Sequence, residues 1–165
     1  MLEEKNIKVS AFNTRKLLAE IAAISLLIML WGVSIWAYFN LPQSIPVHFN
    51  FKGIADRYGS KSNLFILAII ATIIYVGLTL LPRNLKQFNF PNTKTKENTA
   101  DQIAMVANVF MYLKIIVLFI FLVLNLLTCF VSLKLAEGIG GWFYLLLAML
   151  FIPTIVIVRK AIKTK

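Results

Sequence analysis

The only histidine of the chain, His48, lies eight residues before Asp56 in a short polar segment between two long apolar blocks. The segment, residues 41–61, reads LPQSIPVHFNFKGIADRYGSK. Imidazole has an ordinary pKa near neutrality, and a carboxylate can orient the ring, so this pair of residue types can perform acid–base chemistry or bind a polar ligand. No pattern places a nucleophile against the histidine, so the catalytic residues stay unknown. The candidate ligand-binding residues are His48, Asn50, Gly53, Asp56 and Lys61.

Prolines and glycines give the same segment the composition of an ordered loop. Pro42 is expected to end the preceding helix, and Pro46 to keep the following stretch extended. Gly53 and Gly59 indicate turns in which a positive φ is needed. The segment can therefore be a purely structural cap. Alternatively, its turns fold it back so that His48, Asn50 and Asp56 form one cluster, with Lys61 nearby.

Composition indicates the class of protein that contains this segment. Hydrophobic residues make up 59% of the chain, charged residues 15%, and the mean hydropathy is +0.80. Soluble domains are nearer one half apolar and one quarter charged. Four apolar blocks are each close to the roughly 17–25 residues that cross a bilayer as a helix. The first is too long for a signal peptide and ends in aromatic residues, so we expect it to be retained as a span.

The predicted fold is an all-α membrane protein, a bundle of four transmembrane helices in a single domain, residues 1–165. The helices are expected at about 17–39, 64–81, 106–133 and 142–158. A structured outer loop, residues 40–62, joins the first two helices, and a cytoplasmic loop, residues 82–105, joins the second and third.

The distribution of basic residues predicts the orientation. Of the 17 lysines and arginines, twelve lie in the N-terminal segment, the middle loop and the C-terminal tail, and four lie in the first and third loops. The positive-inside bias then places both termini in the cytoplasm and the His48 loop outside. The net charge of +10 mostly reflects this bias, and the basic residues also attract the chain to anionic lipid of the inner leaflet. No nucleic-acid partner is expected, because the basic residues are divided among short segments without a binding motif.

A polar stripe on the third block has two interpretations. Asn125, Thr128 and Ser132 share one helical face with Cys129, which we expect to be a buried small residue. The stripe can hydrogen-bond between helices, or it can line a polar cleft beneath the His48 loop. A weaker stripe on the second block contains Thr72, Tyr75 and Thr79. Lys114, at the start of the third span, is expected to reach the cytoplasmic headgroups.

No metal or other cofactor is expected. A zinc site needs three or four nitrogen, sulfur or oxygen ligands at the ion. The His48 segment offers one histidine and one aspartate, and the single cysteine lies inside an apolar span.

The motif LPxxIPxHFNxxGxxDxxGSK, following one span and leading into another, resembles the outer loop of SdpI-like membrane proteins. The later FNFPNTKTKEN and the YLK at residues 112–114 are similar to the short form of that family, so the resemblance covers about residues 31–125. It implies a bacterial, multi-pass protein of the cytoplasmic membrane. The same domain of unknown function forms the N-terminal part of immunity proteins against a killing peptide, whose second domain has no counterpart here.

Three classes of function are compatible with these observations. In the first, which we favour, the outward loop binds a membrane-active peptide or a lipid-linked envelope component and protects the cell. In the second, a membrane-embedded enzyme uses His48 and Asp56 on a lipid-linked substrate at the outer face. In the third, the chain is a small transporter or accessory subunit. The lack of a charged residue near the middle of any span argues against transport, because coupled carriers usually need one. The sequence does not indicate the oligomeric state.

Overall fold

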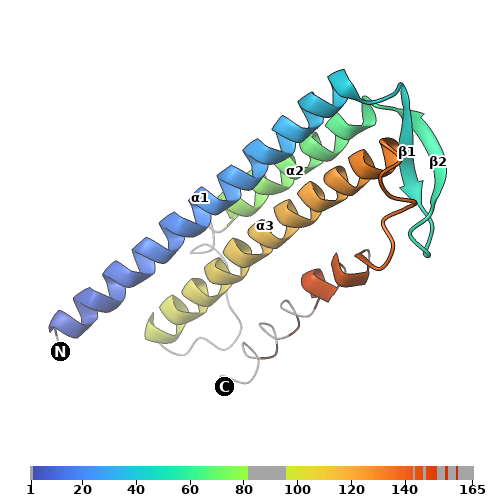
Figure 1. Cartoon of the computed structure of the whole chain (residues 1–165). Coiled ribbons are helices and arrows are strands. Elements are labelled where there is room, and N and C mark those ends of the chain that lie inside the picture. Colours follow the sequence, from blue (N-terminus) through green and yellow to red (C-terminus); the bar gives the residue numbers. More distant parts are fainter. Residues whose placement is uncertain are drawn as a thin grey trace.

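Three long helices and one β-hairpin make up most of the described part of the chain (Figure 1). The computed structural model describes the backbone of residues 2–81, 96–142, 144–146, 148–151, 155 and 159, with side chains from residue 14 in the first range and from residue 106 in the second. The helices are α1 (Leu2–Asn40), α2 (Asn63–Leu80) and α3 (Lys96–Ser132), and the strands are β1 (Ser44–Phe49) and β2 (Ala55–Ser60).

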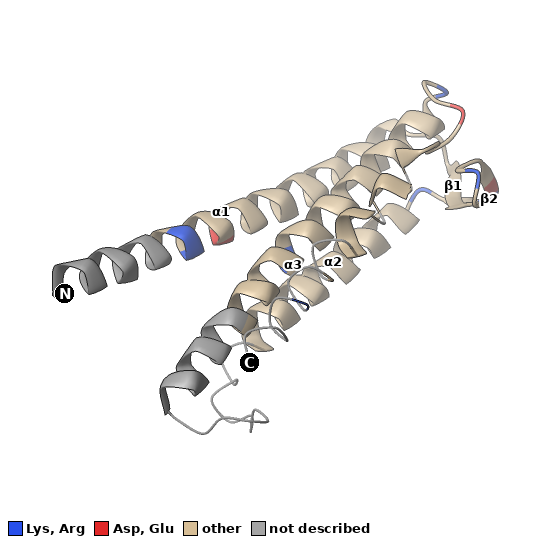
Figure 2. Ribbon diagram, turned by 90° about the horizontal axis from the view of Figure 1, so that it is seen from below, with Lys and Arg blue, Asp and Glu red and all other residues tan. Residues whose placement is uncertain are grey.

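Each helix contains an apolar stretch long enough to cross a membrane: Thr14–Asn40, Asn63–Leu80 and Val106–Ser132. At a rise of about 1.5 Å per residue, these stretches are about 27–40 Å long, and the hydrocarbon core of a bilayer is about 30 Å thick. Charged residues of the described part lie mainly toward the two ends of the helices, with uncharged helix between them (Figure 2). The chain is a multi-pass helical membrane protein.

The helices extend beyond the predicted spans. Helix α1 begins at Leu2 and α3 begins at Lys96, because the polar residues that precede each apolar block include good helix formers such as lysine and glutamate. The prediction of a helical membrane protein is confirmed, and its all-α class is corrected in one detail, since the loop at residues 40–62 contains a β-hairpin. The predicted fourth span, residues 142–158, lies partly outside the described residues, and the described residues within it are helical.

Small residues allow the three helices to pack closely. Ala23 of α1 and Ala68 and Ala71 of α2 are fully buried, together with leucines of α1 and α3. Small side chains at such contacts let helix backbones approach, which favours packing in lipid. A second cluster joins the hairpin to the helices and contains the buried Cys129, as predicted. Its members are Ala37, Leu41, Ile45, Leu64 and Cys129.

The hairpin lies across one end of the helix bundle, which we call the hairpin end (Figure 1). Its tight turn is closed by the Asn50 amide, which donates to the Ile54 carbonyl at 2.9 Å, and by the Gly53 amide, which donates to the Asn50 carbonyl at 2.8 Å. Gly53 has a φ of 75°, in the region that favours glycine. The loop is therefore a folded unit that packs on the bundle, as predicted.

The segment that follows α3 docks against this turn. The Ile139 amide donates to the Gly53 carbonyl at 2.7 Å, and Ile54 forms an isolated antiparallel bridge with Gly138. A Cβ atom on Gly138 would lie 2.2 Å from the Gly53 carbonyl oxygen, so only glycine fits there without displacement. The Tyr144 hydroxyl adds a hydrogen bond to the Phe51 carbonyl at 2.7 Å. The first and third loops are thus joined at the hairpin end.

Candidate functional site

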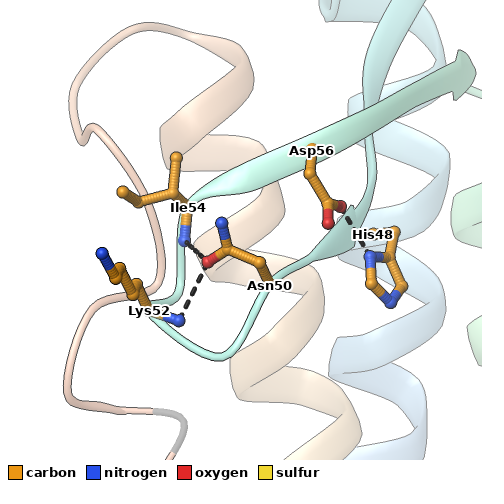
Figure 3. A network of polar contacts seen from close by, with 5 residues as sticks. All are labelled: His48, Asn50, Lys52, Ile54 and Asp56. Atoms are coloured by element: carbon orange, nitrogen blue, oxygen red, sulfur yellow. Dashed lines mark hydrogen bonds and ion pairs between the residues drawn. The ribbon is translucent and has the colours of Figure 1, made fainter.

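His48 and Asp56 face one another because the hairpin is irregular at this point. In the strand register His48 pairs with Arg57 and Phe49 pairs with Ala55, which leaves Asp56 without an opposite residue on β1. Such a bulge interrupts the alternation of side chains between the two faces and redirects the extra residue. His48 Nδ1 and Asp56 Oδ1 are 2.6 Å apart (Figure 3). The structure therefore forms the histidine–carboxylate pair that the sequence predicted.

The exposure of this pair argues against a mainly structural role. The His48 and Asp56 side chains are 54% and 43% exposed. A pair so accessible to solvent contributes no more than about 1 kcal/mol to stability, because water screens the charges. An ionised carboxylate only accepts hydrogen bonds, so His48 Nδ1 is the donor and Nε2 of the neutral ring is left as an acceptor. The carboxylate thus fixes the tautomer of an imidazole that a ligand can reach.

Asn50 and Gly53 shape the turn beside the pair. Asn50 Oδ1 accepts hydrogen bonds from the amides of Lys52 and Ile54, at 2.9 and 3.1 Å, so this side chain is directed into its own turn (Figure 3). Gly53 contributes its positive φ and the carbonyl that binds the Ile139 amide. The predicted cluster is therefore smaller than expected, because the Asn50 oxygen bonds turn amides instead of the histidine–carboxylate pair.

Lys61 makes its contacts at the base of the hairpin. Its Nζ donates to the Leu41 carbonyl at 3.2 Å and lies 5.3 Å from the centre of the Tyr38 ring. A lysine over an aromatic face is held by a cation–π attraction. Lys61 therefore anchors the hairpin to the end of α1, and these contacts connect it to Leu41 and Tyr38, not to the His48–Asp56 pair near which it was predicted to lie.

The predicted structural residues of the loop have different roles. Pro42 follows the end of α1, and Pro46 lies in the extended strand β1, as expected. The prediction for Gly59 is wrong, because this residue lies within β2 and is not among the described residues with positive φ. A Cβ atom there would lie 2.9 Å from Asn63 Nδ2 and 3.1 Å from a Val47 methyl carbon. A larger residue here would require the Asn63 and Val47 side chains to shift, so glycine at this position relates to space and not to turn geometry.

A groove of about 720 Å³ lies between the hairpin and helices α2 and α3. This volume is within the roughly 300–1,000 Å³ of typical small-ligand sites. His48 and Asp56 lie in its wall, and the rest of the lining is mostly apolar. The full lining is Pro46, Val47, His48, Phe49, Asn50, Phe51, Asp56, Asn63, Leu64, Ile66, Leu67, Leu124, Thr128 and Ile139. The groove therefore combines one polar pair with an apolar surface that reaches into the membrane-spanning helices.

The polar stripe of α3 partly hydrogen-bonds between helices and partly lines the groove, so each of the two predicted interpretations holds for some of its residues. Asn125 is fully buried and its Nδ2 donates to Ser34 Oγ of α1 at 2.8 Å, which is hydrogen bonding between helices. Ser132 donates to the Thr128 carbonyl at 2.6 Å within its own helix. Thr128 alone of the three predicted cleft residues lines the groove.

A second charged site, at the far end of the bundle, was missed by the sequence analysis. Lys114 is 4% exposed, and its Nζ binds Glu20 Oε2 of α1 and, at 3.1 Å, Thr79 Oγ1 of α2. The Tyr75 hydroxyl donates to the same glutamate. The prediction that Lys114 reaches the headgroups is therefore wrong. The sequence did contain a signal for this pair. Glu20 and Lys114 are single charges of opposite sign near the starts of the first and third apolar blocks, and charges inside membranes are usually paired.

Comparison with known proteins places the hairpin site inside a recognised family region. Residues 25–72 match the family described as Domain of unknown function (DUF1648), a range that contains the whole hairpin. An uncharacterized protein of Archaeoglobus fulgidus is 35% identical over 71 residues, which cover 38% of this chain and 39% of that relative. No solved structure matches the chain. The chain thus contains a DUF1648 region and is distantly homologous to an archaeal protein.

Proposed function

We propose that this membrane protein binds an amphiphilic ligand in the groove between the hairpin and helices α2 and α3, and that this binding protects the membrane. The ligand is a membrane-active peptide or a lipid-linked envelope component. The single observation that carries the proposal is the composition of the groove, where a solvent-accessible His48–Asp56 pair lies in an otherwise largely apolar lining. Such a surface suits a molecule with a polar head and an apolar tail.

The depth of the groove supports a ligand that enters from the membrane. Leu124, in its lining, lies eight residues before Ser132 at the end of α3, so the groove reaches about 12 Å along that helix. Ile66 also lines it and is 50% exposed on the outside of the bundle. A ligand dissolved in the outer part of the bilayer can therefore reach the apolar wall while its head meets the hairpin.

The orientation and the family resemblance support a protective role. The positive-inside bias predicts that the hairpin faces outward, and the resemblance implies a bacterial cytoplasmic membrane, at whose outer face envelope precursors and membrane-active peptides are encountered. The resemblance of the loop to SdpI-like proteins, which include immunity proteins, points in the same direction.

The groove can be tested by filling it. We expect Leu67→Trp, which places a large ring in the lining, to abolish binding of a fluorescent-tailed lipid or a labelled membrane-active peptide to the chain in nanodiscs. Ile73→Trp is the matched control, because Ile73 lies on the same helix, is 65% exposed and is not part of the groove. Equal binding by both variants, with both proteins monodisperse and helical, would refute the proposal.

The His48–Asp56 geometry also favours a second candidate, a membrane-embedded enzyme that acts on a lipid-linked substrate. The carboxylate holds the imidazole as an acceptor, which is what a general base needs. Thr128 has the only hydroxyl among the described lining residues, and it donates to the Leu124 carbonyl, so water would be the attacking group. An enzyme would lose turnover almost completely in His48→Gln while it retained binding. A binding protein would lose affinity gradually across several lining positions.

A further inference from the structure

The charged groups in the lining of the groove are one carboxylate and one imidazole. Among the described residues, no lysine or arginine belongs to that lining, so the groove carries a formal charge of −1 when His48 is neutral. The cations of the hairpin are not part of this lining. Lys61 binds the Leu41 carbonyl, and Lys52 and Arg57 are exposed and outside the lining. An anionic head would therefore meet a negative site.

The hydrogen-bonding capacity of the pair has the same preference. Asp56 uses Oδ1 for His48 and retains Oδ2, which can only accept, while Nε2 of the neutral His48 ring is also an acceptor. Two acceptors side by side match a group with several N–H donors. A phosphate offers mainly acceptors, so it cannot donate hydrogen bonds to Asp56 Oδ2 and His48 Nε2.

We propose that the groove recognises an ammonium group attached to an apolar peptide, with Asp56 and His48 as its acceptors. This inference rests on the proposed function, since it names the head of the ligand that the groove binds. The ammonium of a common aminophospholipid lies beside its own phosphate, which the groove has no cation to neutralise. The amino terminus of a peptide, or a lysine flanked by apolar residues, has no such anion beside it, so a peptide fits better than a lipid. Removing the positive charge from the ligand weakens binding by about tenfold or more, as expected for loss of a charge-assisted hydrogen bond.

A matched series of peptides tests this preference. One short apolar peptide with an amidated C-terminus is prepared with a free amino terminus, an acetylated one and a succinylated one, which makes the head cationic, neutral or anionic on the same tail. Because the chain has a single histidine, selective ¹⁵N,¹³C-histidine labelling gives one NMR reporter at the site, His48. The full chain is placed in phosphatidylcholine nanodiscs, with and without phosphatidylethanolamine.

We expect the free-amine peptide to shift the His48 signals in a saturable manner, at concentrations about tenfold or more below those that the other two peptides need. Asp56→Asn removes this preference, whereas Glu137→Gln keeps it, because Glu137 is an exposed acid at the same end of the bundle outside the groove lining. Equal or tighter binding of the succinylated peptide would overturn the ammonium assignment and leave the groove as a binding site. Saturable shifts produced by phosphatidylethanolamine alone would assign the site to lipid and overturn the peptide. If no peptide shifts His48 and Leu67→Trp also leaves the binding of labelled lipid unchanged, the proposed function itself fails.

Discussion

The Glu20–Lys114 pair makes the most quantitative prediction, because it joins α1 to α3 inside the membrane. Lys114 is 4% exposed, whereas the Glu20 side chain is 36% exposed. Removing one partner of a fully buried ion pair costs about 3–5 kcal/mol, and hydrogen bonds between helices in lipid average about 0.6 kcal/mol. Because Glu20 is partly exposed, we expect the cost of breaking this pair to lie between these two values.

The two single substitutions should therefore differ. Glu20→Gln leaves the buried ammonium of Lys114 without a carboxylate, and we expect it to lower the free energy of unfolding by about 2–3 kcal/mol. Lys114→Met leaves Glu20 with the Tyr75 hydroxyl and partial solvation, so we expect a loss of about 1–2 kcal/mol. The double variant should lose only about 2–3 kcal/mol, which gives a coupling energy of about 1–2 kcal/mol.

The free energies are measured by titrating the protein with sodium dodecyl sulfate in mixed micelles, followed by circular dichroism and tryptophan fluorescence. Lys52→Met is the control, because it removes a lysine from the exposed turn of the hairpin, and it should change the stability by less than about 0.5 kcal/mol. If the two single losses add up to the double loss within about 0.5 kcal/mol, the pair is not formed in the folded protein and the reasoning is wrong.

Three further predictions concern the hairpin end. Gly138→Ala should detach the turn, because the new Cβ would lie 2.2 Å from the Gly53 carbonyl oxygen. Faster hydrogen exchange of the Ile139 amide would show this detachment. Gly141→Ala, with open space around its Cβ, should leave that exchange unchanged. Lys134→Gly should raise the melting temperature, since Lys134 has a φ of 61° and glycine relieves a strain of about 1 kcal/mol there; an unchanged or lower melting temperature would contradict this. In a background whose single native cysteine is replaced by serine, Lys52→Cys, in the exposed turn, should react with an impermeant thiol reagent in intact cells, whereas Asn92→Cys, at a position outside the described residues, should not. The reverse pattern would overturn the predicted orientation.

The apolar blocks predicted the spans because the bilayer imposes a simple rule on length and polarity. The three long helices contain the first three predicted blocks almost completely, and α1 ends close to Pro42, as the sequence indicated. The starts of α1 and α3 were missed because nothing in the polar residues before an apolar block stops a helix. Hydropathy locates the membrane, not the helix ends.

The hairpin was missed because its strands lack a clear alternation of apolar and polar residues. A bulge displaces Asp56 from the regular register, and Pro46 and Gly59 are residues that usually weaken a strand. Even so, a histidine and a carboxylate eight residues apart, with a turn between them, could be paired from the sequence. The Glu20–Lys114 contact spans 94 residues and depends on how three helices rotate against one another, which a single sequence does not determine.

The contact between the turn of the hairpin and the segment after α3 has a consequence for how the protein is made. Phe51 and Tyr144, which it joins, are 93 residues apart, so at a synthesis rate of about 5–20 residues per second the second arrives about 5–20 s after the first. Ile139, which closes part of the groove, arrives almost as late. During this interval the turn of the hairpin lacks the segment after α3 that docks against it. The groove is therefore one of the last features that the growing chain completes, and a chain released early would carry the His48–Asp56 pair without a finished groove.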